Sequence, residues 1–156
     1  MTWSGTLSAK LYQLLRRKGV WWALFALWLA AVFFASSLTG DEVRPYVPTF
    51  TLHKLGHLLA YSSGAVILAL GWRCSTRWSW RKIVIVSVVM VSVYGATDEW
   101  HQSFTPGRGP SAWDWLLDTV SGLAGISVLL LARRRLQRWL GTAAAKSATG
   151  FSPRRH

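Results

Sequence analysis

The sequence predicts an all-α membrane protein with four transmembrane helices and both termini in the cytoplasm. Apolar residues make up 51% of the 156 residues, and they occur in blocks close to the roughly 20 residues that a helix needs to cross a bilayer. Charged residues make up only 15% of the chain, well below the ~25% typical of soluble domains. Lys and Arg are concentrated in the segments before the first block, between the second and third, and after the fourth.

Four apolar blocks are the expected membrane spans. The first is uncharged, the second contains only His57, the third is uncharged and rich in Val, and the fourth carries two aspartates near its start. The third block is short, so we expect the Trp, Arg and Lys residues before it to snorkel and the bilayer to thin locally. The four expected spans are residues 20–38, 55–72, 83–97 and 113–132.

The first block follows Arg16, Arg17 and Lys18, an arrangement found in signal peptides as well as in membrane anchors. A signal peptide would be cleaved near residues 35–37. The block has 19 residues, more than the roughly 7 to 15 of a signal-peptide apolar region. We therefore expect an uncleaved anchor.

The distribution of Lys and Arg predicts the orientation of the helices. Of 18 such residues, 15 lie before the first span, between the second and third, or after the fourth, which places these segments in the cytoplasm. The other three, Arg44, Lys54 and Arg108, lie on the outer side with all six acidic residues. The net charge of +12 therefore reflects topology, and we expect no nucleic-acid partner.

This pattern divides the chain into three parts. We expect a basic cytoplasmic arm over residues 1–19, a four-helix membrane domain over residues 20–132 and a basic, disordered cytoplasmic tail over residues 133–156. The single Cys74 excludes a disulfide framework and any multi-cysteine metal site, and the chain has no glycine-rich phosphate loop. We expect no cofactor.

Polar residues form a stripe at the outer end of each of the last three spans. Such residues cost free energy in a bilayer unless they face the bundle interior or water, so they indicate a functional site. The third stripe exists only if that helix continues past Thr97. The stripes are Lys54, His57 and Tyr61; Tyr94, Asp98 and His101, with Gln102 beside them; and Asp114, Asp118, Ser121, Gly122 and Gly125.

Several of these residues also have purely structural explanations. Ser111 and Asp114 have the spacing of a capping box, in which Asp114 would only satisfy the backbone at the start of the fourth helix. Gly122 and Gly125 are typical of close helix packing, within one chain or between two. Residues 106–110 form at minimum a tight turn.

The carboxylates are harder to explain in this way. Asp98 and Glu99 lie at the C-terminal end of a helix, where the helix dipole disfavours an anion. We expect compensation from a basic residue on the same side, either Lys54 or Arg108, which follows Glu99 by nine residues. Asp118 lies about 6 Å deeper in the bilayer than Asp114. We expect Asp118 to be partnered or partly protonated.

The stretch from Lys54 to Gly125 resembles the VanZ-like family of small bacterial integral membrane proteins. Its pattern is Asp-Lys, His three residues after the Lys, Tyr four later, Tyr-Gly-x-x-Asp-Glu-x-x-Gln, Pro-Gly-Arg, and Asp-x-x-x-Asn/Asp. His53 stands where the family usually has the first Asp, so a role of that acid, such as pairing with Lys54, does not carry over. The matching residues are Lys54, His57, Tyr61, Tyr94, Gly95, Asp98, Glu99, Gln102, Pro106, Gly107, Arg108, Asp114 and Asp118.

The resemblance implies a multi-pass protein of the bacterial inner (cytoplasmic) membrane, in a family named for a protein associated with resistance to the glycopeptide teicoplanin. With the predicted topology, the polar site faces outside. The first hypothesis is a binding module of the cell envelope that affects glycopeptide sensitivity by engaging a lipid-linked cell-wall intermediate, a drug or a partner protein.

The second hypothesis is an enzyme acting from the outer side on a lipid or polyprenyl-linked substrate. Lys54 and Arg108 would hold phosphate or carboxylate, Glu99 or Asp98 would be the general base, and His57 or His101 would shuttle protons. We expect no metal, and the alternative metal site would use His57, His101 and Glu99. The sequence leaves open whether the protein is an enzyme and how many copies assemble. The candidate cluster is Lys54, His57, Asp98, Glu99, Gln102, Arg108, Asp114 and Asp118.

Overall fold

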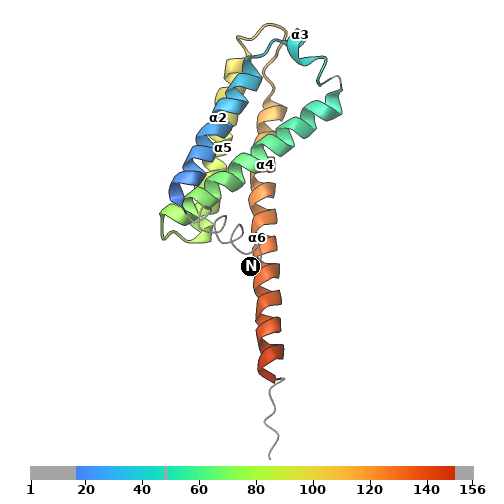
Figure 1. Ribbon diagram of the computed structural model, residues 1–156. Helices are drawn as coiled ribbons and strands as arrows, with labels where there is room; N and C mark the ends of the chain where they lie inside the picture. Colours follow the sequence, from blue (N-terminus) through green and yellow to red (C-terminus); the bar gives the residue numbers. More distant parts are fainter. Residues whose placement is uncertain (1–16, 48, 150–156) are drawn as a thin grey trace, which may run out of the picture. The chain divides into compact units, whose positions relative to one another are not determined.

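The computed structural model describes residues 17–47 and 49–149, and in this part of the chain every regular element is a helix. Figure 1 shows α2 (Lys18–Ser37), α3 (Gly40–Val43), α4 (Phe50–Ser75), α5 (Trp80–Gln102) and α6 (Ala112–Thr149). Four of them contain segments long and apolar enough to cross a membrane: Lys18–Ser37, Thr51–Ser75, Trp80–Gln102 and Ala112–Arg135. The all-α fold with four membrane spans is confirmed.

The third span is longer than the sequence predicts. We expected it over residues 83–97, but α5 covers 23 residues from Trp80 to Gln102. It begins earlier because the Ser79 side chain caps it, accepting a hydrogen bond from the Lys82 backbone N–H at 3.4 Å. It ends later because polar side chains near its end have partners on neighbouring helices: Asp98 accepts from Tyr61 of α4, and His101 lies 3.0 Å from Ser37 of α2. Local thinning of the bilayer is therefore not needed.

The fourth span also continues beyond its expected end. We expected a tail without regular structure from residue 133, yet α6 is helical as far as Thr149. Residues 133–149 are rich in Ala, Arg and Leu, which have high helix propensity. The first 16 residues and residues 150–156, which hold most of the predicted arm and the end of the tail, lie outside the described residues.

Contacts divide the chain into two compact units, and the first ends at Ile126. In this unit α2 packs against α4 and α5, and α4 packs against α5. Trp28 joins α2 to α4, because its indole N–H donates to the Ala60 carbonyl at 2.8 Å and its ring fills the space beside Gly64. Tyr94 joins α5 to α2 by donating its hydroxyl to the Leu29 carbonyl at 2.7 Å.

Small residues bring α4 and α6 close together. A Cβ atom on Gly125 would lie 2.6 Å from the Ser62 carbonyl oxygen, and the Ser62 hydroxyl donates to the Ser121 carbonyl at 2.8 Å. Gly122 faces Ala65 at ordinary contact distance. The packing interpretation of Gly122 and Gly125 is confirmed, and the contact is made within one chain.

At one end of the first unit, α2 and α5 terminate and α4 and α6 begin, and the short helix α3 lies there as well (Figure 1). We call this the α3 end. A tight turn holds it together. The Arg108 N–H donates to the Thr105 carbonyl at 3.1 Å, and between them Gly107 has φ 72°, which a glycine adopts without strain. Gly40 of α3 donates its N–H to the Pro106 carbonyl at 2.9 Å. The predicted turn is therefore present, and it supports α3.

The short helix α3 is closed by a complete capping box. The Thr39 hydroxyl oxygen accepts a hydrogen bond from the Glu42 N–H, and the Thr39 N–H donates to the Glu42 carboxylate at 2.8 Å. The hydrogen bonds from the backbone and side chain of Thr39 lower the pKa of Glu42 below its ordinary value. This fixes α3 beside the polar residues described next.

Candidate functional site

Two pairs of side chains connect α4 to α6 at the α3 end. Lys54 forms an ion pair with Asp114, and three residues further along α4 the His57 Nδ1 lies 2.8 Å from the Asp118 Oδ1. Lys54 and His57 are three residues apart on α4, and their partners are four residues apart on α6. Residues at these spacings lie on one face of a helix, so both pairs form side by side. Asp118 is fully buried, and the expectation that it has a partner is confirmed.

Asp98 connects α5 to α4. Its Oδ2 accepts hydrogen bonds from the Tyr61 hydroxyl at 3.3 Å and from the Gln102 side-chain amide at 3.0 Å. Only 5% of Asp98 is exposed. The predicted residues Asp98 and Gln102 therefore belong to the same buried cluster as Lys54 and His57.

Glu99 takes the capping role at the start of α6 that the sequence suggests for Asp114. The Ser111 hydroxyl accepts the Asp114 N–H at 3.2 Å, as a helix cap does. The reciprocal bond of a capping box comes instead from Glu99, whose Oε2 accepts the Ser111 N–H at 2.7 Å. The Asp114 carboxylate is left to pair with Lys54, so capping is not its whole role.

We expect Arg108 from the sequence to compensate the negative charges of Asp98 and Glu99, but its hydrogen bonds go elsewhere. Its guanidinium donates to the Ala35 carbonyl at 3.0 Å and to the Leu38 carbonyl at 3.2 Å. These carbonyls lie at the C-terminal end of α2, where backbone oxygens lack helical partners and the helix dipole favours a cation. The two carboxylates instead accept hydrogen bonds from neutral donors, at the Asp98 Oδ2 and the Glu99 Oε2.

His101 lies outside the cluster. Its Nε2 is 3.0 Å from the Ser37 hydroxyl, and its ring stacks on Phe33 with centroids 4.7 Å apart. Glu99 and His101 are two residues apart, which is about 200° around a helix, so they face opposite ways. The alternative metal site of His57, His101 and Glu99 is therefore wrong, and Asp118 takes the place of His101 beside the other two.

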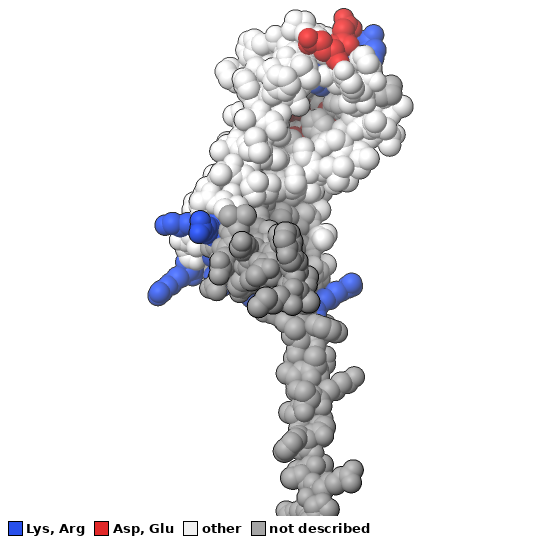
Figure 2. Space-filling model, viewed as in Figure 1, with Lys and Arg blue, Asp and Glu red and all other residues white. Residues whose placement is uncertain are grey.

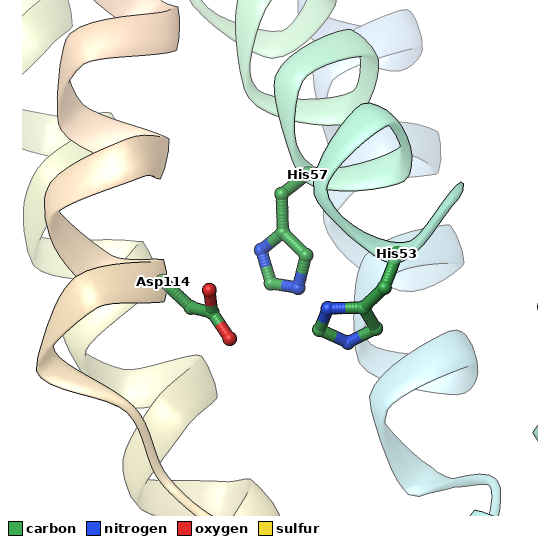
Figure 3. A group of neighbouring side chains, drawn as sticks. All are labelled: His53, His57 and Asp114. Carbon is green, nitrogen blue, oxygen red and sulfur yellow. The ribbon is translucent and has the colours of Figure 1, made fainter. Parts of the chain in front are cut away.

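His53, which is not part of the cluster predicted from the sequence, lies in the site. Its ring centroid lies 4.7 Å from that of His57, and Figure 3 shows both imidazoles, from α4, turned toward Asp114 of α6. The i, i+4 spacing of His53 and His57 is the signal that places them on one helix face. The family pattern hides this signal, because it has Asp at the position of His53.

Two adjoining cavities open at this end of the molecule. The first, of about 380 Å³, is lined mainly by apolar residues of α2 and α4, including Val32, Ala35 and Leu52. The second, of about 530 Å³, is lined mainly by polar groups. The space-filling view shows a hollow near the α3 end with charged side chains inside it (Figure 2). Residues lining both cavities are Val43, Val47, His53, Gln102 and Arg108.

A sequence model of the VanZ/LLP1 family matches residues 20–133. The match covers the second and third apolar segments in full, all but the outermost two residues of the first and fourth, and every residue of the candidate cluster. Comparisons with curated proteins and with solved structures gave no significant match.

Proposed function

The chain belongs to the VanZ/LLP1 family, and we propose that it is a binding protein of the bacterial cell envelope whose site takes an anionic lipid-linked cell-wall intermediate. We call the apolar cavity of the site the groove and the polar cavity the pocket. The adjacency of the two is the observation that carries this proposal. A ligand with a hydrocarbon chain and a charged head group needs both environments side by side.

The groove suits a hydrocarbon chain. Among the residues lining it, Leu52 is 48% exposed and Tyr46 is 79% exposed, so the groove is open along the side of the bundle. In a membrane, such an opening faces lipid, and a prenyl or acyl chain enters without crossing water.

The pocket suits a phosphate. Arg44, Lys54 and Arg108 line it together with His53, against the single carboxylate of Asp114. Arginine offers several N–H donors that match phosphate oxygens, and lysine adds a compact charge. A bound phosphate would interact with Lys54 alongside Asp114.

We place the site on the outer face of the cytoplasmic membrane. The exposed basic residues Arg73, Arg77, Arg81 and Lys82 lie at the opposite end of the bundle, around the connection between α4 and α5, and such clusters favour the cytoplasmic side. An outward-facing site would meet lipid-linked intermediates at the face where glycopeptide drugs act. Loss of the protein should therefore change glycopeptide sensitivity.

The test is binding of a polyprenyl phosphate to the full-length protein in nanodiscs, measured by native mass spectrometry. We expect binding of the phosphate but not of the corresponding free polyprenol. Arg44→Gln should weaken binding about tenfold, the effect of about 1.4 kcal/mol. Arg44 is exposed, so this variant should fold normally, and Arg73→Gln at the other end is the matched control.

A second variant addresses the groove. Gly56 lines the groove and has open space beside its Cα, so Gly56→Trp should fill the groove and abolish binding of the lipid. Added inorganic phosphate should not change lipid binding. Equal binding of polyprenol and polyprenyl phosphate, or unchanged binding by both variants, would contradict the proposal.

One observation favours an enzyme as the second candidate. His57 lines the groove, and its Nδ1 is oriented by the buried Asp118, an arrangement that general bases use. If the protein cleaves a lipid-linked head group, His57→Gln and Glu99→Gln should abolish product release while leaving lipid binding intact. Absence of turnover by the wild-type protein in the same assay would contradict the enzyme candidate, and binding would be the only proposed function.

A further inference from the structure

We propose that His57, Glu99 and Asp118 bind a divalent transition-metal ion where α4, α5 and α6 meet. Each helix contributes one ligand. The three ligand atoms, one from each side chain, lie within 4.8 Å of one another. Around a tetrahedral ion with bonds of about 2.1 Å, ligand atoms are about 3.4 Å apart. Side-chain rotations of modest size would therefore close this set around an ion.

Two buried oxygen atoms of this set lack partners. The Glu99 Oε1 and the Asp118 Oδ2 make no hydrogen bond among the described residues, although Glu99 is only 6% exposed and Asp118 is fully buried. Buried polar atoms are nearly always satisfied, because leaving one unpaired costs free energy. A cation between these carboxylates would satisfy both oxygens at once.

The other oxygen of Glu99 is already held in place, because the Glu99 Oε2 accepts the Ser111 N–H at 2.7 Å. The Asp118 Oδ1 lies 2.8 Å from the His57 Nδ1, so two of the three ligand groups already lie side by side. Gly95 leaves room for this geometry, since a Cβ atom there would lie 3.2 Å from the Asp118 Oδ2. Such supporting contacts orient the ligands of metal sites.

The ligand types indicate which ions fit. One imidazole and two carboxylates suit Zn²⁺ and Mn²⁺, whereas an all-oxygen set would suit Mg²⁺ or Ca²⁺. Zn²⁺ should bind more tightly than Mn²⁺, following the general affinity order of divalent ions. Cys74, the only cysteine of the chain, is not among the ligand atoms.

A neighbouring set competes for the same histidine. His53, His57 and Asp114 also bring ligand atoms within 4.8 Å of one another (Figure 3). In that set the Asp114 carboxylate already pairs with Lys54, and none of the three side chains has an unsatisfied buried atom. The geometry therefore assigns the ion to the set with Glu99 and Asp118.

The test uses the full-length protein in detergent, stripped of metal with a chelator and titrated with Zn²⁺, Mn²⁺ or Mg²⁺. We expect one Zn²⁺ per chain by elemental analysis, weaker binding of Mn²⁺ and none of Mg²⁺ at the same concentration. Glu99→Gln and Asp118→Asn should each weaken Zn²⁺ binding at least tenfold. His53→Ala and His101→Ala are the matched controls and should bind as the wild type does.

X-ray absorption of the Zn²⁺-loaded wild-type protein keeps the proposal testable if a carboxylate variant does not fold. We expect one imidazole and otherwise oxygen ligands. Less than stoichiometric Zn²⁺, two imidazoles in the spectrum, or loss of binding in His53→Ala would overturn the assignment. All measurements are made without polyprenyl lipid, so their failure and the failure of the proposed function are separate results.

Discussion

Lys54 and Asp114 show how a single ion pair matters at the residue scale. The Asp114 side chain is only 9% exposed and that of Lys54 25% exposed. Two charges in such a place cost desolvation, which their attraction offsets only while both are present. Removing one partner is therefore more damaging than removing both.

We predict that Lys54→Met lowers the unfolding free energy by about 3 kcal/mol, measured by thermal unfolding in detergent. The double variant with Asp114→Leu should recover most of this loss. Arg44→Met is the control, because Arg44 pairs with Asp41 at the surface, where their side chains are 78% and 93% exposed, and such pairs contribute little. Additive losses in the double variant would contradict the prediction.

The identities of the site residues could be predicted at this scale, but their partners could not. Helical spacing and the cost of burying charge indicated Lys54, Asp98 and Asp118. Arg108 was assigned the wrong partners, because nothing in the sequence says that the turn lies over the end of α2, where Arg108 bonds to two carbonyls. Contacts between residues far apart in the chain depend on the packing of whole helices.

At the scale of elements, the contact between α4 and α6 sets the register of the site. Gly125 faces the Ser62 backbone, and the same two helices carry the Lys54–Asp114 and His57–Asp118 pairs. Any change that separates these helices should therefore weaken the pairs as well. The stripes on both helices were predicted from spacing, whereas their pairing required the structure.

We predict that Gly125→Ala lowers stability by about 1–3 kcal/mol, the usual cost of overpacking. The added methyl would lie 2.9 Å from the Ser62 Cα and 2.6 Å from its carbonyl oxygen, and backbone atoms cannot yield as a side chain can. Gly56→Ala is the matched control, because that position on α4 is open. Equal melting temperatures of the two variants would show that α4 and α6 are less closely packed.

At the scale of the whole molecule, the helical bundle with four spans followed from hydropathy alone. Apolar blocks of membrane length allow few other folds, because every backbone polar group must be satisfied inside the bilayer. The ends of α5 and α6 could not be predicted in this way, since polar residues continue both helices beyond the apolar blocks. The charge distribution also predicts that the α3 end of the bundle lies outside the cytoplasm, and this orientation stays a prediction.

Cysteine labelling tests that orientation in intact cells. Cys74 is exposed near the basic end of the bundle, and we expect a membrane-impermeant thiol reagent not to reach it. In a Cys74→Ser background, Asp41→Cys at the α3 end should be labelled, because the Asp41 side chain is 93% exposed. Labelling of Cys74 but not of Asp41→Cys would reverse the topology and move the site to the cytoplasmic side.

The hydrogen bonds of Arg108 bear on the order in which the site is assembled during synthesis. They join residues 70 and 73 positions apart, and α2 leaves the ribosome long before the turn does. Until then, water must satisfy the last carbonyls of α2. Arg108 also lines the groove, so the wall of the groove is complete only after Arg108 has been synthesised and has reached the end of α2. The site therefore cannot be complete while only α2 to α5 are inserted.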